Sequence, residues 1–291
     1  MKATLIECLS VSNTLGEGVL WDSVRKRAWW TDIQERRLYR YEPLSRALER
    51  FDLPERLASF GFIEGNERII AAFESGFAYY HPDSGTLEWI SRPKHAAANV
   101  RFNDGRVDRQ GRFWAGSMIE DQGEPVGKLY CLAKGISKEH LADIAISNSL
   151  CFSPDGQHMY FADSPRREIL KFDLDADTGA LSNRQIFVRT ARGAYPDGST
   201  MDSDGHLWNA QWGAGCVVRY APDGTVSGRV ELPVTQPTCV AFGGDAFDLL
   251  MVTSARETLD APTLEAEPQA GNLFIFETDV AGCEESRYRI A

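Results

Sequence analysis

The 291-residue sequence lacks an excess of basic residues. Lys and Arg total 31 against 42 Asp and Glu, so the net charge at pH 7 is −11. A protein that binds nucleic acid needs a basic face for the phosphates, and this deficit excludes nucleic acid as an expected partner. No apolar run approaches the roughly 20 residues of a membrane-spanning helix, so we expect no membrane partner. The start, MKATLIECLSVSN, has one Lys and no long apolar stretch, unlike a signal peptide, and we expect a cytoplasmic protein.

Short motifs for thiolate metals, nucleotides and serine nucleophiles are also missing. The six cysteines never form a CxxC pair, and the five histidines show no HxH or HExxH spacing. Scattered cysteines in a chain of this length indicate reduced residues rather than a disulfide scaffold or a zinc site. Neither GxGxxG, GxxxxGK[ST] nor GxSxG occurs. Any metal site in this protein would therefore use mainly oxygen ligands.

A weak internal repeat runs through the whole chain. Six times, a turn-like stretch is followed by a short β-rich run, at intervals of about 40 to 48 residues. The six runs are Trp29–Asp32, Ile69–Ala72, Phe113–Gly116, Met159–Asp163, Leu207–Ala210 and Leu250–Thr253. Each is followed by a run that alternates polar and apolar residues, as half-buried antiparallel strands do.

This period, with several short strands in each unit, is typical of a β-propeller blade. We therefore predict an all-β fold: one six-bladed propeller over residues 1–291, with four antiparallel strands per blade and almost no helix. The strand over residues 3–8 is expected to complete the last blade, because a closed ring has to pair both of its open edges. A β-sandwich with extra hairpins is the alternative.

Polar side chains recur at one position of the repeat. In a propeller, the innermost strand of each blade comes just before the β-rich run, and a site forms where these strands reach one mouth. About ten to twelve residues before four of the runs, the chain has an oxygen-bearing side chain. These residues are Glu17, Asn103, Asn148 and Asp197.

Two carboxylates and two amides directed at one axis suit a divalent cation. Uncompensated carboxylates repel each other, so either one is protonated or a cation lies between them. Asn oxygens can coordinate a cation without neutralising it, and waters can complete the ligand set. Each residue on its own is also ordinary turn chemistry, and the shared position is what favours a metal site.

The motifs around these residues resemble the regucalcin, or senescence marker protein/gluconolactonase, family. The matching blocks occur in order and cover essentially the whole chain: LGEGVLWD, RFNDGRVDRQGRFWAGSM, ISNSLCFSPDG, YPDGSTMDSDGHLW, CVAFGG, TSARE and PQAGNLF. The resemblance implies a six-bladed propeller that uses one divalent cation to hydrolyse sugar lactones to aldonic acids. The cation is Ca²⁺, Zn²⁺, Mg²⁺, Mn²⁺ or Fe²⁺, and the expected partner is the small-molecule lactone.

The resemblance also implies roles for individual residues. Glu17, Asn148 and Asp197 match the metal ligands, and Asp197 also matches the general base. Arg101 and Asn103 match a substrate-contacting pair. The family's acidic substrate contact falls in Met118-Ile-Glu-Asp121, where Asp121 holds the aligned place and Glu120 lies beside it.

Two other functions compete with a sugar lactonase. One is a broader esterase or organophosphatase that uses the same metal site, and the other is a non-catalytic calcium-binding propeller. A scaffold needs no water-activating carboxylate, so the presence of Asp197, Glu17 and Arg101 in this pattern favours catalysis. We expect a monomer or a weak homo-oligomer.

Overall fold

The computed structural model describes residues 1–95, 97, 99–120 and 124–290, and their regular secondary structure is almost entirely β-strand. Their strands, β1 to β24, form six antiparallel sheets of four strands each. In five sheets the strands pair in chain order, and in the sixth β1 takes the fourth place, beside β24. This is the architecture of a six-bladed β-propeller, and the fold class predicted from the repeat is confirmed.

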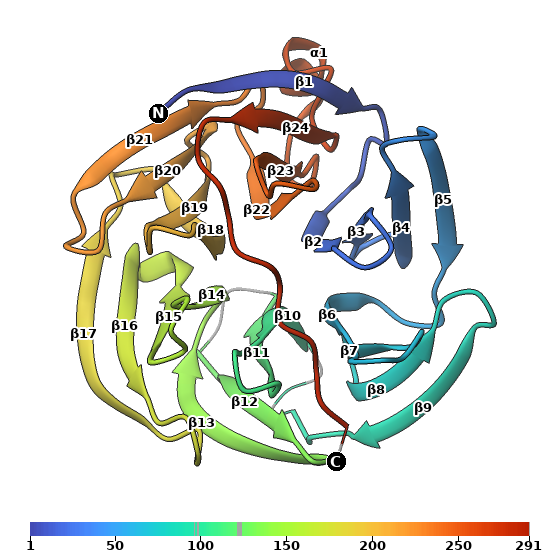
Figure 1. The fold of residues 1–291 in the computed structure, drawn as a ribbon, viewed down its shortest axis with the longest axis vertical. Coiled ribbons are helices and arrows are strands. Elements are labelled where there is room, and N and C mark those ends of the chain that lie inside the picture. The colour runs from blue at the N-terminus through green and yellow to red at the C-terminus, as the bar shows by residue number, and fades with distance from the viewer. Residues whose placement is uncertain (96, 98, 121–123, 291) are drawn as a thin grey trace. The chain divides into compact units, whose positions relative to one another are not determined.

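The chain divides into two compact units, and the first consists of Met1–Asp52 and Thr190–Glu285. It contains three blades (Figure 1). They are β2 (Gly16–Asp22), β3 (Arg27–Asp32), β4 (Arg37–Glu42) and β5 (Ala47–Asp52); β18 (Tyr195–Met201), β19 (Leu207–Trp212), β20 (Cys216–Tyr220) and β21 (Val226–Glu231); and β22 (Pro237–Gly243), β23 (Leu249–Ser254), β24 (Leu273–Thr278) and β1 (Ala3–Leu9). The expected strand over residues 3–8 is β1.

The second unit consists of Leu53–Arg189 and Ser286–Ala291 and also contains three blades. They are β6 (Leu57–Phe62), β7 (Ile69–Phe73), β8 (Gly76–His81) and β9 (Thr86–Ser91); β10 (Val100–Val107), β11 (Phe113–Ile119), β12 (Gly127–Ala133) and β13 (Ile136–Ile144); and β14 (Ser147–Phe152), β15 (His158–Asp163), β16 (Glu168–Leu174) and β17 (Leu181–Arg189). The six β-rich runs of the sequence repeat are therefore the second strands of the blades, from β3 to β23.

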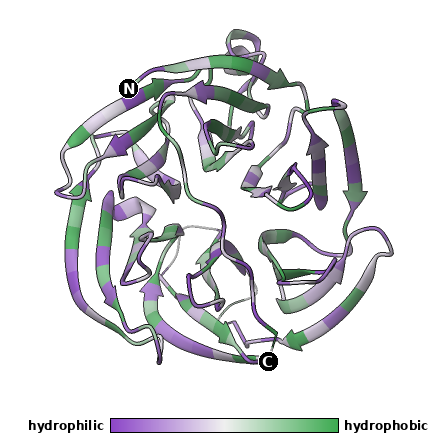
Figure 2. Cartoon of the chain, in the orientation of Figure 1, coloured by the Kyte–Doolittle hydropathy of each residue, from purple (hydrophilic) through white to green (hydrophobic). Residues whose placement is uncertain are grey.

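Burial decreases across each blade from its first strand to its fourth. All residues of β6, β14 and β22 are buried, whereas β5 and β21 are mostly exposed. The strand β7, Ile69–Phe73, is entirely apolar, while fourth strands such as β17 carry both hydrophilic and hydrophobic residues (Figure 2). Strands covered on both faces need continuous apolar sequence, and an outer strand needs it on one face only. A polar residue on a first strand therefore requires a specific reason.

Three second strands each bury a tryptophan whose indole N–H is satisfied by a polar side chain. Trp30, Trp114 and Trp208 are fully buried. Trp114 Nε1 donates to Asp108 Oδ2 at 2.8 Å, and Trp208 Nε1 donates to Asp202 Oδ2 at 2.9 Å. A buried N–H without a partner would be destabilising, so these turn aspartates stabilise the blade core.

Helical structure among the described residues is limited to α1 (Ala261–Ala266) and a single 3₁₀ turn, η1 (Ser164–Arg166). The side chain of Asp260 caps α1 by accepting a hydrogen bond from the Thr263 N–H at 3.0 Å. In the part of the chain that the structure covers, no helix is long and apolar enough to cross a membrane.

Candidate active site

The first strand of every blade contains a β-bulge, and the candidate site residues lie at these bulges. The regular pairing is interrupted between Glu17 and Leu20, Leu57 and Ser59, Phe102 and Gly105, Asn148 and Cys151, Pro196 and Ser199, and Pro237 and Val240. A bulge breaks the alternation of a strand and re-aims a side chain, and bulges are common beside active sites.

The four polar residues identified from the repeat have closely similar places at their bulges. Glu17 and Asn148 are the last paired residues before the bulge, and Asn103 and Asp197 are the first residues inside it. The residues after Glu17 and Asn148 both adopt the left-handed conformation, with φ of 60° at Gly18 and 59° at Ser149. Glu17 and Asn148 therefore share one backbone geometry, and Asn103 and Asp197 share the next position of the bulge.

In the second unit, two of these residues are directly hydrogen-bonded. Asn103 Nδ2 donates to Asn148 Oδ1 at 3.0 Å and to the Ser147 carbonyl at 2.9 Å. Asn148 Nδ2 in turn donates to Ser164 Oγ at 2.9 Å, where η1 begins. Both asparagines are buried. Their amides are thus held in one orientation, with Asn148 Oδ1 as an acceptor.

Arg101 lies two residues before Asn103 and is buried in the same network. Its Nη1 donates to Asn103 Oδ1 at 2.8 Å and to the Phe102 carbonyl at 2.9 Å, and its Nε donates to Glu120 Oε1 at 3.0 Å. The structure therefore brings together Arg101, Asn103, Glu120 and Asn148 from the sequence-predicted set. Asp121 lies outside the described residues.

A second arginine, Arg56, holds the other side of Glu120. Its Nη1 and Nη2 donate to Glu120 Oε1 and Oε2 at 2.7 and 3.0 Å, and its Nε donates to Glu74. Burial raises the pKa of the Glu120 carboxyl, but the hydrogen bonds and charges of Arg56 and Arg101 outweigh it and hold that pKa below its ordinary value. Glu120 is therefore ionised at neutral pH and accepts hydrogen bonds only.

Asp104 is the next residue inside the β10 bulge, and its pKa is shifted in the opposite direction to that of Glu120. It is buried, and this burial raises the pKa of its carboxyl. Its Oδ2 accepts a hydrogen bond from the Leu150 N–H at 2.7 Å, which joins the bulge of β10 to the strand β14. We interpret Asp104 as the group that connects these two blades.

In the first unit, Asp197 is held by its backbone. Its carbonyl accepts a hydrogen bond from Asn209 Nδ2 at 2.9 Å, and the same nitrogen donates to Ser199 Oγ at 3.0 Å. The following Gly198 lies against β22, because a Cβ there would come within 2.7 Å of Cys239 Sγ. Only glycine allows the backbone beside Asp197 to approach β22 so closely.

Glu17 lies in the β2 bulge of the same unit. The N–H of Gly18 donates to Glu17 Oε2 at 3.0 Å, and the preceding Gly16 carbonyl accepts a hydrogen bond from Thr238 Oγ1. Thr238 belongs to β22, which packs against both β2 and β18. Glu17 and Asp197 thus lie on the two strands that flank β22.

We expect Gly18→Ala to lower the free energy of unfolding by about 1 kcal/mol, because its φ of 60° disfavours any residue with a Cβ. Affinity for the predicted metal should fall as well, because a backbone shift that relieves this strain would move the Gly18 N–H away from Glu17 Oε2. Urea denaturation and calorimetric titration with Mn²⁺ measure the two effects. Gly65→Ala is the matched control, since Gly65 has a φ of 63° and open space around a Cβ. Equal metal affinities in the two variants would contradict this role of Gly18.

Each of the three residues predicted as metal ligands offers an oxygen that suits a divalent cation. Asn148 Oδ1 accepts one hydrogen bond, from Asn103, which leaves its second lone pair for a metal. Glu17 and Asp197 are buried carboxylates, 7% and 5% exposed, and such groups are found paired with cations or metals. Two carboxylates and an amide oxygen are hard ligands of the kind that Ca²⁺, Mg²⁺ and Mn²⁺ prefer.

A separate group of Asp202, Asp204 and His206 offers three ligand atoms within 4.8 Å of one another. Asp202 Oδ2, however, accepts hydrogen bonds from Arg219 Nε at 2.7 Å and from the buried Trp208 indole. Its Oδ1 accepts the N–H groups of Asp204 and His206. A guanidinium already neutralises this carboxylate, so the group serves the blade turn and is a weaker metal candidate.

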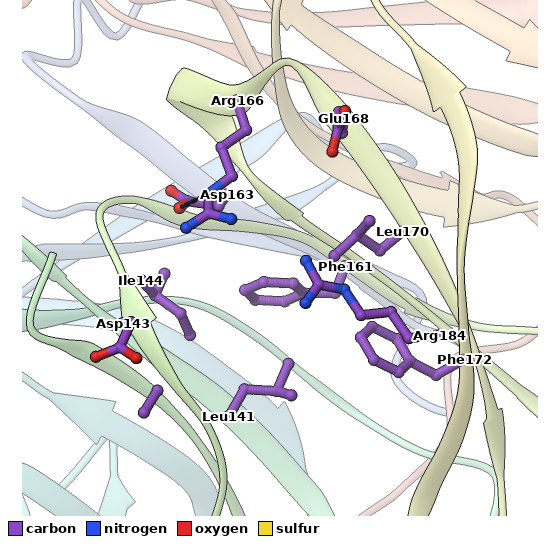
Figure 3. Close-up of a pocket in the computed structure, with 11 residues that line it drawn as sticks. Leu141, Asp143, Ile144, Phe161, Asp163, Arg166, Glu168, Leu170, Phe172 and Arg184 are labelled. Atoms are coloured by element: carbon purple, nitrogen blue, oxygen red, sulfur yellow. Dashed lines mark hydrogen bonds and ion pairs between the residues drawn. The ribbon is translucent and has the colours of Figure 1, made fainter.

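One cavity of about 280 Å³ lies between blades of the second unit (Figure 3). Its apolar floor includes Phe161, Leu170 and Phe172, which are almost completely covered by protein. On its rim, Asp163 accepts hydrogen bonds from Arg166 Nε at 3.0 Å and from the Ile146 N–H at 2.9 Å. None of the bulge residues described above lines this cavity, so we do not regard it as the candidate active site.

Sequence reasoning did not single out Arg56, Glu74 or Asn209. Arg56 and Glu120 are 64 positions apart, and no spacing rule connects them. Asn209 had a usable signal, because it is one of two polar residues in the second strand β19, whose other residues are apolar.

The chain is similar to proteins of one known family. Residues 15–256 match the family model described as the SMP-30/Gluconolactonase/LRE-like region. The chain is 39% identical to the L-arabinolactonase of Azospirillum brasilense, covering 99% of this chain and 95% of that protein. It is 36% identical to the 6-deoxy-6-sulfogluconolactonase of Pseudomonas putida, covering 98% of each.

A solved structure has the same fold. The calcium-binding protein regucalcin of Agrobacterium tumefaciens superimposes with a TM-score of 0.94 at 35% identity, covering 99% of this chain and 98% of that one. The family match extends over most of the chain and includes every bulge that carries a candidate residue. This protein therefore belongs to the SMP-30/gluconolactonase/LRE-like family.

Proposed function

We propose that this protein is a hydrolase that opens sugar lactones to aldonic acids with the help of one divalent cation. The observation that carries the proposal is the recurrence of Glu17, Asn103, Asn148 and Asp197 at the bulges of first strands. The relatives named L-arabinolactonase and 6-deoxy-6-sulfogluconolactonase support the substrate class.

Glu17, Asn148 and Asp197 are the proposed metal ligands. Two carboxylates supply the negative charge that a divalent ion requires, and the Asn148 oxygen adds a neutral ligand whose direction Asn103 and Ser164 fix. When bound, the cation would polarise the lactone carbonyl and stabilise the negative charge that develops on its oxygen.

Asp197 is the proposed general base. Its carboxylate takes a proton from the attacking water as the water oxygen bonds to the carbonyl carbon. When the bond from that carbon to the ring oxygen breaks, Asp197 returns the proton to the ring oxygen, which becomes a hydroxyl. The product is the aldonic acid, and the carboxylate is regenerated. The Asn209 hydrogen bond to the Asp197 backbone keeps the base in place.

Arg101, Asn103 and Glu120 are the proposed substrate contacts, with Asp121 as a further candidate. Glu120 is an ionised acceptor and suits the hydroxyl donors of a sugar. Asn103 and Arg101 are hydrogen-bonded to each other, so they present a preorganised polar surface.

A lactone panel tests the function. Metal-stripped protein is reloaded with Ca²⁺, Mg²⁺, Mn²⁺, Fe²⁺ or Zn²⁺ and assayed on pentono- and hexonolactones, an aryl ester and a phosphotriester. We expect hydrolysis of sugar lactones that depends on the metal and is lost on chelation, because the lactone carbonyl is otherwise weakly polarised.

Two results would contradict the proposal. Faster turnover of the aryl ester or phosphotriester than of any lactone would indicate a broader esterase or organophosphatase. Calcium binding without turnover of any substrate would indicate a calcium-binding protein, the description that regucalcin of Agrobacterium tumefaciens carries.

A further inference from the structure

Arg56 belongs to the segment that leads into β6, and it forms hydrogen bonds with two acidic side chains. It donates both terminal nitrogens to the two oxygens of Glu120, at 2.7 and 3.0 Å, and its Nε to Glu74. A bidentate guanidinium–carboxylate pair fixes the plane of the carboxylate as well as its charge. Glu120, whose carboxylate is held in this way, comes directly after β11. Near this end of β11, Met118 pairs with Arg101 of β10.

Glu120 is the centre of a chain of charged contacts within the second unit. Arg56 holds it from one side, and Arg101 Nε, at 3.0 Å from Oε1, holds it from the other. Arg101 also fixes Asn103, which in turn contacts Asn148. Among the described residues, the charged groups facing Glu120 are Arg56 and Arg101, with Glu74 behind Arg56.

Glu120 is nevertheless within reach of a small molecule. Its side chain is 26% exposed and that of Arg56 is 22% exposed, whereas that of Arg101 is 5% exposed. A carboxylate oxygen can accept more than one hydrogen bond, so the two arginines do not exhaust its capacity. Glu120 can therefore accept a further hydrogen bond from a ligand.

We propose that Arg56 is a positioning residue for sugar recognition: it holds the Glu120 carboxylate in the orientation in which Glu120 accepts a hydrogen bond from a hydroxyl of the lactone. This inference rests on the proposed lactone hydrolysis and specifies its substrate as a lactone with a free hydroxyl at this place. An anionic substituent there would be repelled by Glu120, and a deoxygenated ring would leave the acceptor unused.

The first test compares substrates with and without hydroxyls. Arg56→Met should raise KM for the best aldonolactone about tenfold and change kcat less than about twofold, because binding rather than chemistry is affected. For γ-butyrolactone, which has no hydroxyl, KM should stay unchanged. Arg56→Lys should give an intermediate KM, since it keeps the charge and loses the fork.

Arg68→Met is the matched control. Arg68 lies in the same blade, with 30% of its side chain exposed, and also pairs with a carboxylate, Glu88, at 2.9 Å. It lacks a contact with Glu120, so its KM values should equal those of the unmodified protein. Thermal melting of all three variants separates loss of folding from loss of positioning.

The second test measures the pKa of the Glu120 carboxyl, without any substrate turnover. In ¹³C NMR with labelled glutamate, the pKa of the Glu120 carboxyl should rise toward its ordinary value in Arg56→Met, because one of its two guanidinium partners is gone. Since Glu120 acts in its ionised form, the acid limb of kcat/KM should move to higher pH in this variant.

The third test is a double-mutant cycle. If Arg56 acts through Glu120, the Arg56→Met, Glu120→Gln protein should have the same KM as Glu120→Gln alone. An unmodified protein that hydrolyses no lactone would overturn the proposed function, and this inference with it. An active protein whose KM for aldonolactones is unchanged by Arg56→Met would overturn this inference alone, as would additive effects in the cycle.

Discussion

Asp197→Asn is expected to lower kcat for lactone hydrolysis by about 10²–10⁴-fold at saturating metal. The amide keeps an oxygen of similar size at the same place, so a metal can still be bound. It cannot take a proton from water, because the amide oxygen is far less basic than a carboxylate. The measurement is initial rate against substrate at several metal concentrations, so that reduced occupancy is not mistaken for reduced catalysis.

The chain offers a close control in the same blade. Asp223 stands in the same tripeptide, Pro-Asp-Gly, but in the turn between β20 and β21, where its Oδ1 accepts the Thr225 N–H at 2.9 Å. Asp223→Asn should leave kcat unchanged. If Asp197→Asn keeps nearly full kcat at saturating metal, the base is another group, and Glu17 is the next candidate.

Glu17→Gln is expected to weaken binding of the divalent cation by at least about 100-fold, more than the loss of a group that only supports a ligand. Glu17 supplies one of the two negative charges proposed to neutralise the ion, and glutamine keeps the shape without the charge. Calorimetric titration with Ca²⁺ and Mn²⁺ measures the affinity. At metal concentrations that restore occupancy, part of the activity should return, since the proposed base is intact.

Glu49→Gln is the control for this variant in the same blade. Glu49 lies on the exposed strand β5 and pairs with Arg40 Nη2 at 2.6 Å. Glu49→Gln removes one negative charge from the protein, as Glu17→Gln does, but leaves the charge at the β2 bulge unchanged. Unchanged affinity in both variants would place the metal elsewhere, and the Asp202, Asp204 and His206 group would then be the next to test.

The repeat, and with it the fold class, could be predicted from the sequence because each blade is a local structure. Four consecutive strands with tight turns pair with their neighbours in the chain, so the pattern of apolar runs and turn residues is repeated with the blade. The runs beginning at Trp29, Phe113 and Leu207 are accordingly the second strands of three blades. The equivalent positions of Glu17 and Asp197 in their repeats were found in the same way, by counting back about ten to twelve residues from the β-rich runs.

What local counting cannot supply is contact between residues from different blades. Asn103 and Asn148 are 45 positions apart, and their hydrogen bond depends on how the bulges of β10 and β14 face each other. The reach of Arg56 to Glu120 depends likewise on the packing of β6 against β10. No periodicity carries this information, because the contacting side chains belong to different repeats.

The sequence by itself determined that the chain forms six blades and that oxygen-bearing side chains recur at one place in their first strands. Both follow from short-range rules of strand alternation and turn chemistry. Only the tertiary structure decided that this place is a β-bulge, that Arg101 orients Asn103, and that Arg56 and Arg101 together hold the pKa of Glu120 below its ordinary value. The first two features are backbone and side-chain geometry within one strand, which no pattern of residue types specifies. The third is a contact between blades of one unit, and it is set by the packing of whole sheets rather than by any one segment.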